Sequence, residues 1–277
     1  MTKHPDLEFV FKYNPEKKSH LLNAYDAATA LYGISRSISI ITHYAINGTI
    51  IKQAPAIRNA EVFVQPPNAG SFEFIVPIVQ LAPDPSTKLG TIIYGVGASY
   101  IYDLTKLIFA RLSGKSEKSS SETIQNLQRT KSNEIDAVSD SIEEDIVRIQ
   151  RPIINNVCNI NIYGGGDNII NLDIGTYEYS RTKIISSTVE QFFGHVTSFN
   201  SSSGKGRFWV ENENRTIGFS VHKEREALSK HEKGYLSSSL DAWVRSLQGE
   251  LILVGFPLRS KQGLLKHIFV TQINKIG

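Results

Sequence analysis

The sequence predicts an α+β protein in which an N-terminal antiparallel sheet is covered by two helices and a five-stranded β-barrel follows. Three observations lead to this fold class. Apolar residues alternate with their neighbours from Leu7 to Tyr13, as in a half-buried strand. Apolar residues recur three or four positions apart from Ser19 to Asn47, as along one side of a helix. Five strand-like runs, interrupted by one helical stretch, occupy the C-terminal third of the chain.

The N-terminal domain is expected to span residues 1–112. After the long helix, the runs 61–65 and 71–80 have the composition of two hairpin strands joined by a turn that contains Pro and Gly. A second helix is expected from Ser86 to Leu112. Its segment Leu89–Tyr102 has no charged residue, but it is shorter than the about 20 apolar residues of a membrane-spanning helix. We therefore expect a buried helix, with insertion into a membrane after a trigger as the alternative.

Residues 113–152 are expected to form a linker and then an amphipathic, coiled-coil-like helix. The segment 113–123 is small and polar, which is typical of linkers. Beyond it, apolar residues recur three or four positions apart in an otherwise polar sequence. A narrow apolar stripe of this kind is typical of a coiled-coil seam or of a helix that docks on a neighbour. The candidate oligomerisation residues on this stripe are Ile135, Val138, Ile142, Ile146 and Ile149.

Residues 153–189 are expected to hold an exposed β-hairpin that connects this helix to the barrel. Val157–Ile174 alternates β-forming residues with Asn around a Gly-Gly-Gly-Asp turn. The glycines lack the Lys-Ser/Thr pair of a phosphate loop, so a hairpin is the better interpretation. The barrel is expected over 190–277. Its order of three strands, a helix and two strands predicts an OB-like barrel, with an SH3-like barrel as the nearest alternative.

The sequence shows no motif of a catalytic centre, a metal site or a cofactor site. The seven histidines form no metal-binding helix motif, and the single cysteine, Cys158, excludes an internal disulfide and a thiolate-rich metal site. His43 follows Arg36 on the long helix and is expected to be a satisfied structural histidine, with a functional cluster as the alternative. The N-terminus lacks the pattern of a secretory signal. We therefore expect a cytoplasmic, non-enzymatic protein.

The hairpin Gly194–Glu211 resembles the opening hairpin of cold-shock and related OB domains. It has Gly-x-Val and Phe-Asn in its first strand and Lys-Gly before an aromatic second strand. The resemblance implies aromatic rings that stack on bases and cations that follow the phosphates. Phe208 and Trp209 are adjacent and must face opposite sides, so one of them is expected in the core. The candidate residues for binding nucleic acid or a protein are Phe199, Lys205, Arg207, Phe208 and Trp209. The alternative is that this hairpin only begins the barrel.

The segment Leu21–Ile78 resembles the opening domain of an uncharacterised family of bacterial two-domain proteins. The shared features are a Tyr-Asp-Ala-Ala helix, an Asn-Gly helix end, an Ala-Pro step and a Gly-Ser-Phe strand start. The resemblance implies a five-stranded barrel in the C-terminal part and an association with antiviral defence. It implies no activity.

These observations lead to three hypotheses on function. The first is a homo-oligomeric assembly protein of antiviral defence, whose copies meet along the apolar stripe and whose barrels bind another protein. The second is single-stranded nucleic-acid binding through the barrel hairpin. The third is a defence effector whose helix Leu89–Leu112 perturbs membranes after activation, with no membrane contact in the resting state. An enzyme would require residues distant in sequence to converge.

Overall fold

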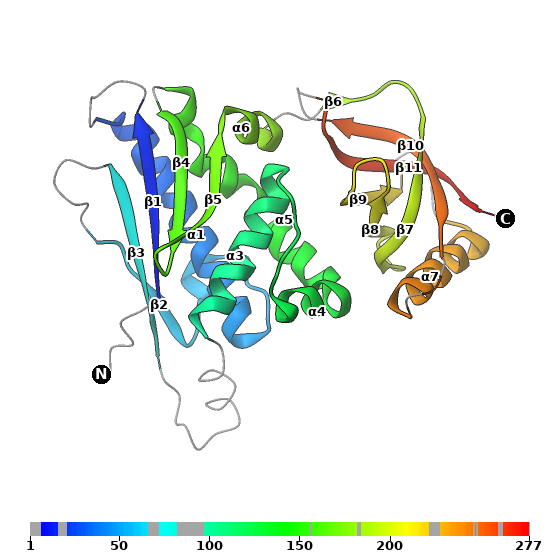
Figure 1. Cartoon of the computed structure of the whole chain (residues 1–277), viewed down its shortest axis with the longest axis horizontal. Coiled ribbons are helices and arrows are strands. Elements are labelled where there is room, and N and C mark those ends of the chain that lie inside the picture. Colours follow the sequence, from blue (N-terminus) through cyan, green and yellow to red (C-terminus); the bar gives the residue numbers. More distant parts are fainter. Residues whose placement is uncertain are drawn as a thin grey trace, which may run out of the picture. The chain divides into compact units, whose positions relative to one another are not determined.

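The fold is that of a computed structural model, which describes residues 7–15, 21–65, 72–81, 97–155, 157–181, 184–221, 228–245, 247, 249–259 and 263–276. The chain divides into two compact units, one formed by residues 1–124 and 136–180 and the other by residues 125–135 and 181–277. The first unit contains the strands β1 (Glu8–Pro15), β2 (Ala60–Val62), β3 (Glu73–Gln80), β4 (Val157–Gly164) and β5 (Asp167–Asp173), the helices α1 (Ala24–Asn47), α3 (Ala98–Ser113) and α6 (Ile174–Arg181), and the 3-10 helices η1 (Ala54–Ala56) and η2 (Arg151–Ile154) (Figure 1). Most of the helix α4 (Glu122–Thr130) and the start of α5 (Ser132–Ile149) belong to the second unit, and the rest of α5 belongs to the first.

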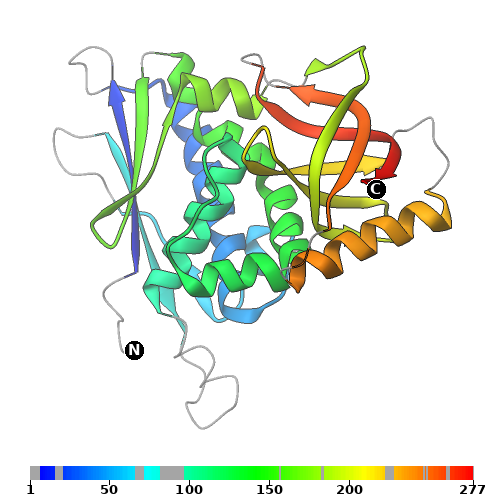
Figure 2. The same ribbon diagram turned by 45° about the vertical axis from the view of Figure 1, so that its right-hand side comes forward.

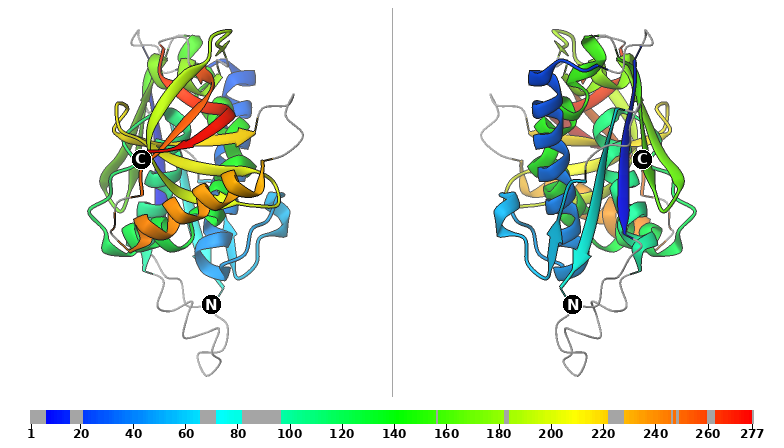
Figure 3. Two further views of the ribbon diagram at one scale, coloured as in Figure 1. Left: turned by 90° about the vertical axis from the view of Figure 1, so that its right-hand side faces the viewer. Right: turned by 90° about the vertical axis from the view of Figure 1, so that its left-hand side faces the viewer.

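The first unit is built on an antiparallel sheet of order β2-β3-β1-β4-β5. The central strand β1 pairs with β3 on one side and with β4 on the other. It buries Phe9, Phe11 and Tyr13 and leaves Lys12 exposed on the opposite face. The helices α1, α3 and α5 lie on the buried face, and the right-hand view of Figure 3 shows the strands from the opposite side (Figures 2 and 3). The predicted sheet with helices on one face is therefore confirmed.

The hairpin of β4 and β5 forms two of the five strands of this sheet, which corrects the prediction of a connector over 153–189. Ile160 and Ile162 of β4 are buried on the helix side. Asn159 and Asn161 point to the other face, where they accept hydrogen bonds from Asn14 (2.7 Å) and from Asn171 (2.6 Å) respectively. The alternation of Ile and Asn thus belongs to strands with one apolar and one polar face. The first unit therefore extends far beyond residue 112.

Helix α1 begins and ends where short polar residues satisfy its backbone. Asn23 Oδ1 accepts from the N–H groups of Tyr25 (2.9 Å) and Asp26 (3.3 Å). Residues 19 and 20 of the predicted helix lie outside the described residues. Gly48 follows the last turn with φ of 64°, so the predicted Asn-Gly helix end is confirmed.

His43 is a buried structural residue, as expected. The backbone N–H of Arg58 donates to His43 Nδ1 over 3.1 Å. Because Nδ1 is the acceptor, the proton lies on Nε2, which donates to Thr49 Oγ1 over 3.0 Å. Burial lowers the pKa of His43, and the charge of Arg58 lowers it further. The neutral ring therefore ties the end of α1 to the segment that leads into β2.

The second predicted helix is seen from Ala98, where α3 begins. Residues 89–96, which supply much of the apolar segment considered for membrane insertion, lie outside the described residues. Among the helices that the structure describes, none has the length and apolar composition that crossing a bilayer requires.

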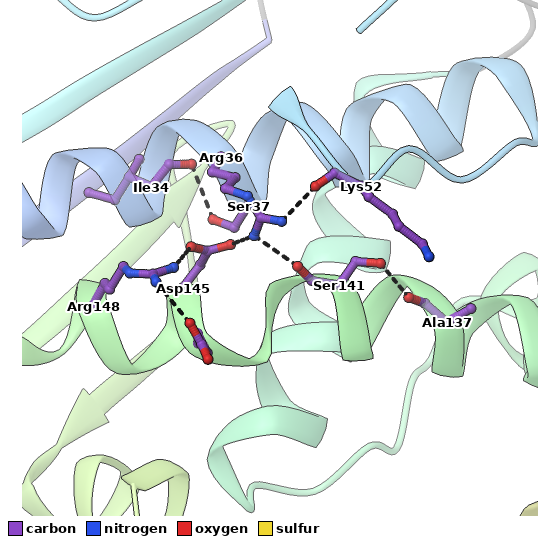
Figure 4. A network of polar contacts seen from close by, with 9 residues as sticks. Ile34, Arg36, Ser37, Lys52, Ala137, Ser141, Asp145 and Arg148 are labelled. Atoms are coloured by element: carbon purple, nitrogen blue, oxygen red, sulfur yellow. Dashed lines mark hydrogen bonds and ion pairs between the residues drawn. The ribbon is translucent and has the colours of Figure 1, made fainter. Parts of the chain in front are cut away.

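The apolar stripe of α5 is buried inside a single copy of the chain, which corrects its interpretation as a seam between copies. Its five residues are all 0% exposed: Ile135, Val138, Ile142, Ile146 and Ile149. The helix packs closely on α1, because a Cβ atom added at Gly33 would lie 2.8 Å from the Asp145 carbonyl oxygen. Arg36 of α1 also donates to the Ser141 carbonyl over 2.8 Å (Figure 4). The stripe is thus an intramolecular packing surface, so it supports neither a coiled coil nor oligomerisation.

The second unit is a closed barrel. Besides residues 125–135, its elements are β6 (Ile184–Ile185), β7 (Glu190–Asn200), β8 (Lys205–Val210), β9 (Arg215–Val221), α7 (Lys230–Val244), β10 (Leu251–Arg259) and β11 (Leu265–Lys275). The five long strands close in the order β7-β8-β9-β11-β10-β7, with β9 and β11 parallel and all other pairs antiparallel. With a helix after the third strand, this is the OB arrangement, so the predicted barrel is confirmed.

Candidate nucleic-acid interface

Strand β8, the second strand of the barrel, separates the predicted binding residues between its two faces. Phe208 and Val210 belong to the apolar core, where Phe208 is fully buried. Because side chains alternate along a strand, Lys205, Arg207 and Trp209 face outward. The prediction that one of the two adjacent aromatic residues lies in the core is confirmed. Phe208 is consequently not available to a ligand.

Phe199 also faces the core, although the sequence placed it among the candidate contacts. The register between β7 and β8 shifts between Val196 and Ser198, which inserts one extra residue into β7. Beyond this bulge the inward and outward positions of β7 are exchanged. The Phe199 ring therefore stacks on the buried Phe219 ring, with 6.4 Å between centroids and an interplanar angle of 15°.

Arg207 is engaged with the neighbouring strand. Its side chain is on the outward face but the residue is only 8% exposed, and Nη2 donates to the Thr216 carbonyl of β9 over 2.8 Å. It therefore holds β8 to β9 and is poorly placed to follow phosphates. Lys205 and Trp209 remain as the candidate ligand contacts, and Lys205 is exposed.

Lys205 lies beside a structured turn between β7 and β8. Asn200 Oδ1 accepts from the backbone N–H groups of Ser202 (3.0 Å) and Ser203 (3.1 Å). Gly204 has φ of 68°, a conformation that a side chain would disfavour. In OB domains, ligands bind to the face of the second and third strands and to this first loop. Lys205 therefore lies at the junction of both regions.

Trp209 is held in place by a stack of three rings. Its ring is parallel to that of His195 within 17°, with centroids 6.2 Å apart, and His195 stacks in turn on Trp243 of α7 at 5.8 Å. Burial lowers the pKa of His195, and the charge of Glu250 acts in the opposite direction. The neutral imidazole is thus a spacer that orients Trp209.

Sequence reasoning missed His195 and Trp243. His195 could have been found, because it lies directly opposite Trp209 in the register of the β7–β8 hairpin. Trp243 lies on a helix whose contact with β7 leaves no local pattern in the sequence.

The formal charge is unevenly distributed along the chain. Residues 181–277 contain 14 Lys and Arg against 8 Asp and Glu, a formal charge of +6. Residues 1–180 contain 16 against 19, a formal charge of −3. The net charge of +3 for the whole chain is therefore the sum of a basic barrel and a mildly acidic remainder. A basic barrel favours an anionic ligand.

Two family models cover most of the chain. Residues 9–181 match the domain of unknown function DUF7946. The chain belongs to the DUF7946 family. The DUF7946 match includes β4, β5 and α6, in agreement with the extent of the first unit. Residues 188–274, which contain the barrel, match the family of unknown function DUF7947. Neither a curated protein nor a solved structure matches the chain.

Metal-ligand geometry is not evident in the part of the chain that the structure describes. Within these ranges, no three His, Cys, Asp or Glu side chains gather as a metal ion would require.

Proposed function

We propose that the barrel binds single-stranded nucleic acid through the outward face of β8. The observation that carries this proposal is the placement of Trp209 and Lys205 on one face of the second strand of an OB-like barrel. The basic charge of the barrel supports it, because phosphate neutralisation supplies most of the affinity of such proteins.

The two residues have different roles in this proposal. Trp209, held by the His195–Trp243 stack, provides an aromatic surface on which a base stacks. Every base has such a face, so this contact tolerates different sequences. Lys205, next to the first loop, pairs with a phosphate. Arg207 positions β8 and makes no direct contact with the ligand.

A titration of fluorescein-labelled single-stranded oligonucleotides with the full chain, followed by fluorescence anisotropy at low salt, tests the proposal. Trp209→Ala should weaken binding by about 5- to 100-fold, as expected for the loss of one base stack. Lys205→Ala should reduce the slope of log K against log salt by about one phosphate contact.

The matched control is Lys12→Ala, which removes an exposed lysine from the sheet of the first unit and should leave binding unchanged. Thermal unfolding of each variant shows whether the barrel remains folded. The proposal is wrong if the wild-type chain does not bind at low salt, or if folded Trp209→Ala binds as the wild type does.

A role of this binding in bacterial antiviral defence follows from the family resemblance alone, and it stays a prediction. The membrane-perturbing alternative also stays a prediction, because much of the segment that it concerns lies outside the described residues.

A further inference from the structure

The N-terminal half of α1 exposes large side chains on one side of the helix. Leu21, just before the helix, is 81% exposed, Tyr25 is 67% exposed and Tyr32 is 58% exposed. The spacing of seven residues between Tyr25 and Tyr32 places these two rings along one line of the helix. On an ordinary protein surface, exposed apolar residues are scattered singly. Here two exposed tyrosines lie on the same side of one helix, so this face is a candidate for contact with a partner.

A row of four charged residues runs beside these rings on α5 and η2. Its members, called the charge row below, are Asp140, Glu144, Arg148 and Arg151. Asp140, Glu144 and Arg148 are spaced by four residues and follow one line along α5, and Arg151 continues the row at the start of η2. Two acidic residues thus precede two basic ones, and the row as a whole is neutral.

The aromatic line and the charge row form one surface. The guanidinium of Arg148 lies over the Tyr32 ring at 5.5 Å from its centroid, and that of Arg151 lies over the Tyr25 ring at 4.7 Å. Helix α1 runs antiparallel to α5, because Arg36 contacts Ser141 while Asp26, nearer the start of α1, contacts Arg151. A hollow of about 400 Å³ between the two helices is lined by Tyr32, Arg36, Asp140, Ser141, Glu143, Glu144 and Arg148.

Buried carboxylates hold this surface in a fixed conformation. Asp145 is fully buried and accepts from Arg36 and from Arg148 Nη1 (2.6 Å), while Arg148 Nη2 donates to Glu144 over 2.8 Å (Figure 4). The nearly buried Asp26 accepts from Arg151 Nε over 2.7 Å. A partner would therefore meet arginines that are already oriented, which lowers the entropic cost of association.

We propose that two copies of the chain pair through this face about a two-fold axis. A two-fold axis brings the same surface of both copies together in opposite directions. The charge rows of the two copies then run antiparallel to each other. Asp140 therefore faces Arg151 of the second copy, and Glu144 faces Arg148 of the second copy. Tyr25 and Tyr32 become buried beside these pairs.

The neutral, ordered row fits a second copy better than a uniformly charged partner. A nucleic acid would place phosphates against Asp140 and Glu144, and like charges in contact disfavour such a complex. Tyr and Arg, which dominate this surface, are the residues that contribute most to protein–protein contacts. The row extends over only 12 residues, from Asp140 to Arg151, so the contact is small and the dimer is expected to be weak, with a dissociation constant on the order of micromolar.

Sedimentation velocity of the full chain, over a concentration series from below to above 100 μM, tests the proposal. The wild-type chain should show a reversible monomer–dimer equilibrium. Tyr25→Ser combined with Tyr32→Ser should weaken it at least tenfold, and Glu144→Lys should weaken it as well. The control is Tyr235→Ser on α7, which removes an exposed tyrosine of the barrel and should leave the equilibrium unchanged.

Cross-linking tests the geometry of the pair. In a Cys158→Ser background, Glu144→Cys places a thiol close to the expected two-fold axis, and a short bismaleimide should link two copies. The control Ser202→Cys, in the loop between β7 and β8, should not be linked above background. The proposal is overturned by a chain that stays monomeric throughout the series, by an association that persists in the folded tyrosine variant, or by equal cross-linking at both positions.

Discussion

The two units of the chain differ in the chemistry of their interiors. In the first unit, charged or amide side chains are buried where segments distant in sequence meet: Asp26, Arg111, Asp145 and Gln150. The core cluster of the barrel consists of apolar side chains from its strands and from α7 and the residue Leu228 before it. The buried charged residues of this unit lie elsewhere, Arg207 on the outward face of β8 and Glu232 in the capping box of α7. Long-range polar pairs thus join the segments of the first unit, whereas the core cluster of the barrel is apolar.

Arg111 and Gln150 show how these polar pairs join the first unit. Arg111 of α3 bonds Glu117 (2.7 Å) and Asp136 of α5 (2.7 Å). Burial acts to lower its pKa, but these carboxylates raise the value above that of a free arginine. The Gln150 amide, after α5, accepts from Thr176 (2.6 Å) and donates to Ser180 (3.0 Å) of α6. Breaking such a pair leaves a buried polar group without compensation, which is why we expect the first unit to be the more sensitive to single polar substitutions.

The largest effect is expected from Asp145→Ala, which leaves Arg36 and Arg148 without their shared carboxylate. Burial raises the pKa of Asp145 and the hydrogen bonds from Arg148 and Arg36 oppose that rise, so the carboxylate depends on both arginines. The free energy of unfolding of the first unit should fall by about 3 kcal/mol. Urea unfolding followed by far-UV circular dichroism measures this change. Trp209 and Trp243, the only tryptophans, both lie in the barrel, so the tryptophan emission should report an unchanged barrel transition.

The control for this prediction is Asp241→Ala on the surface of α7. Asp241 pairs with Arg245 over 3.0 Å, but both side chains are more than half exposed, so the loss should stay below about 1 kcal/mol. Equal losses for the two variants would contradict the contrast between the units.

Intermediate effects of opposite sign are expected from two glycines in helices. Gly33→Ala places a methyl group 2.8 Å from the Asp145 carbonyl oxygen and 3.0 Å from Arg148 Cβ, so it should destabilise the first unit by about 1 to 3 kcal/mol. Gly234→Ala in α7 meets no atom within 4 Å and should stabilise the barrel by about 1 kcal/mol through helix propensity. Urea midpoints of the two variants provide the measurement. A stabilised Gly33→Ala chain would show that α5 does not pack on α1 as described.

The smallest effect is expected from the pH dependence of His43. Its pKa in the folded chain is below the ordinary value of 6.5, so the unfolded chain takes up a proton first as the pH falls. This contribution to stability is complete above pH 6.5 and is lost as the pH falls from there towards the pKa of the folded chain. The unfolding free energy of the first unit between pH 7.5 and 5 should therefore decrease more in the wild type than in His43→Asn, which cannot titrate. Parallel curves for the two proteins would contradict the role assigned to this ring.

The barrel and the helix end at Gly48 could be predicted because their determinants are local. Alternation along β7 to β11 and the Asn-Gly pair each lie within a few consecutive residues. The partner of α5 could not be predicted in the same way. The spacing of Ile142, Ile146 and Ile149 indicates that this side of the helix is buried, but a sequence does not tell whether it is buried within the same copy or against another molecule. Gly33, which permits the close approach, carries no signal of its distant partner.

Within the candidate interface, the sequence identified the correct strand but could not assign all of its residues. Alternation established that Phe208 and Trp209 face opposite sides. The extra residue between Val196 and Ser198 turned Phe199 inward, and a bulge of this kind has no reliable local pattern. The bond from Arg207 to the Thr216 carbonyl likewise depends on the neighbouring strand, so its burial became visible only in the fold.

The central position of β1 has a consequence for synthesis of the protein on the ribosome. This strand is synthesised long before one of its two neighbours, β4, which begins only at Val157. Until then the nascent chain exposes an unpaired strand edge of the kind that recruits other chains. The barrel strands pair within residues 190–275, so the longest delay there, between β7 and β10, is shorter. Folding of the first unit is therefore expected to be the slower step and the one in which the chain would most benefit from a chaperone.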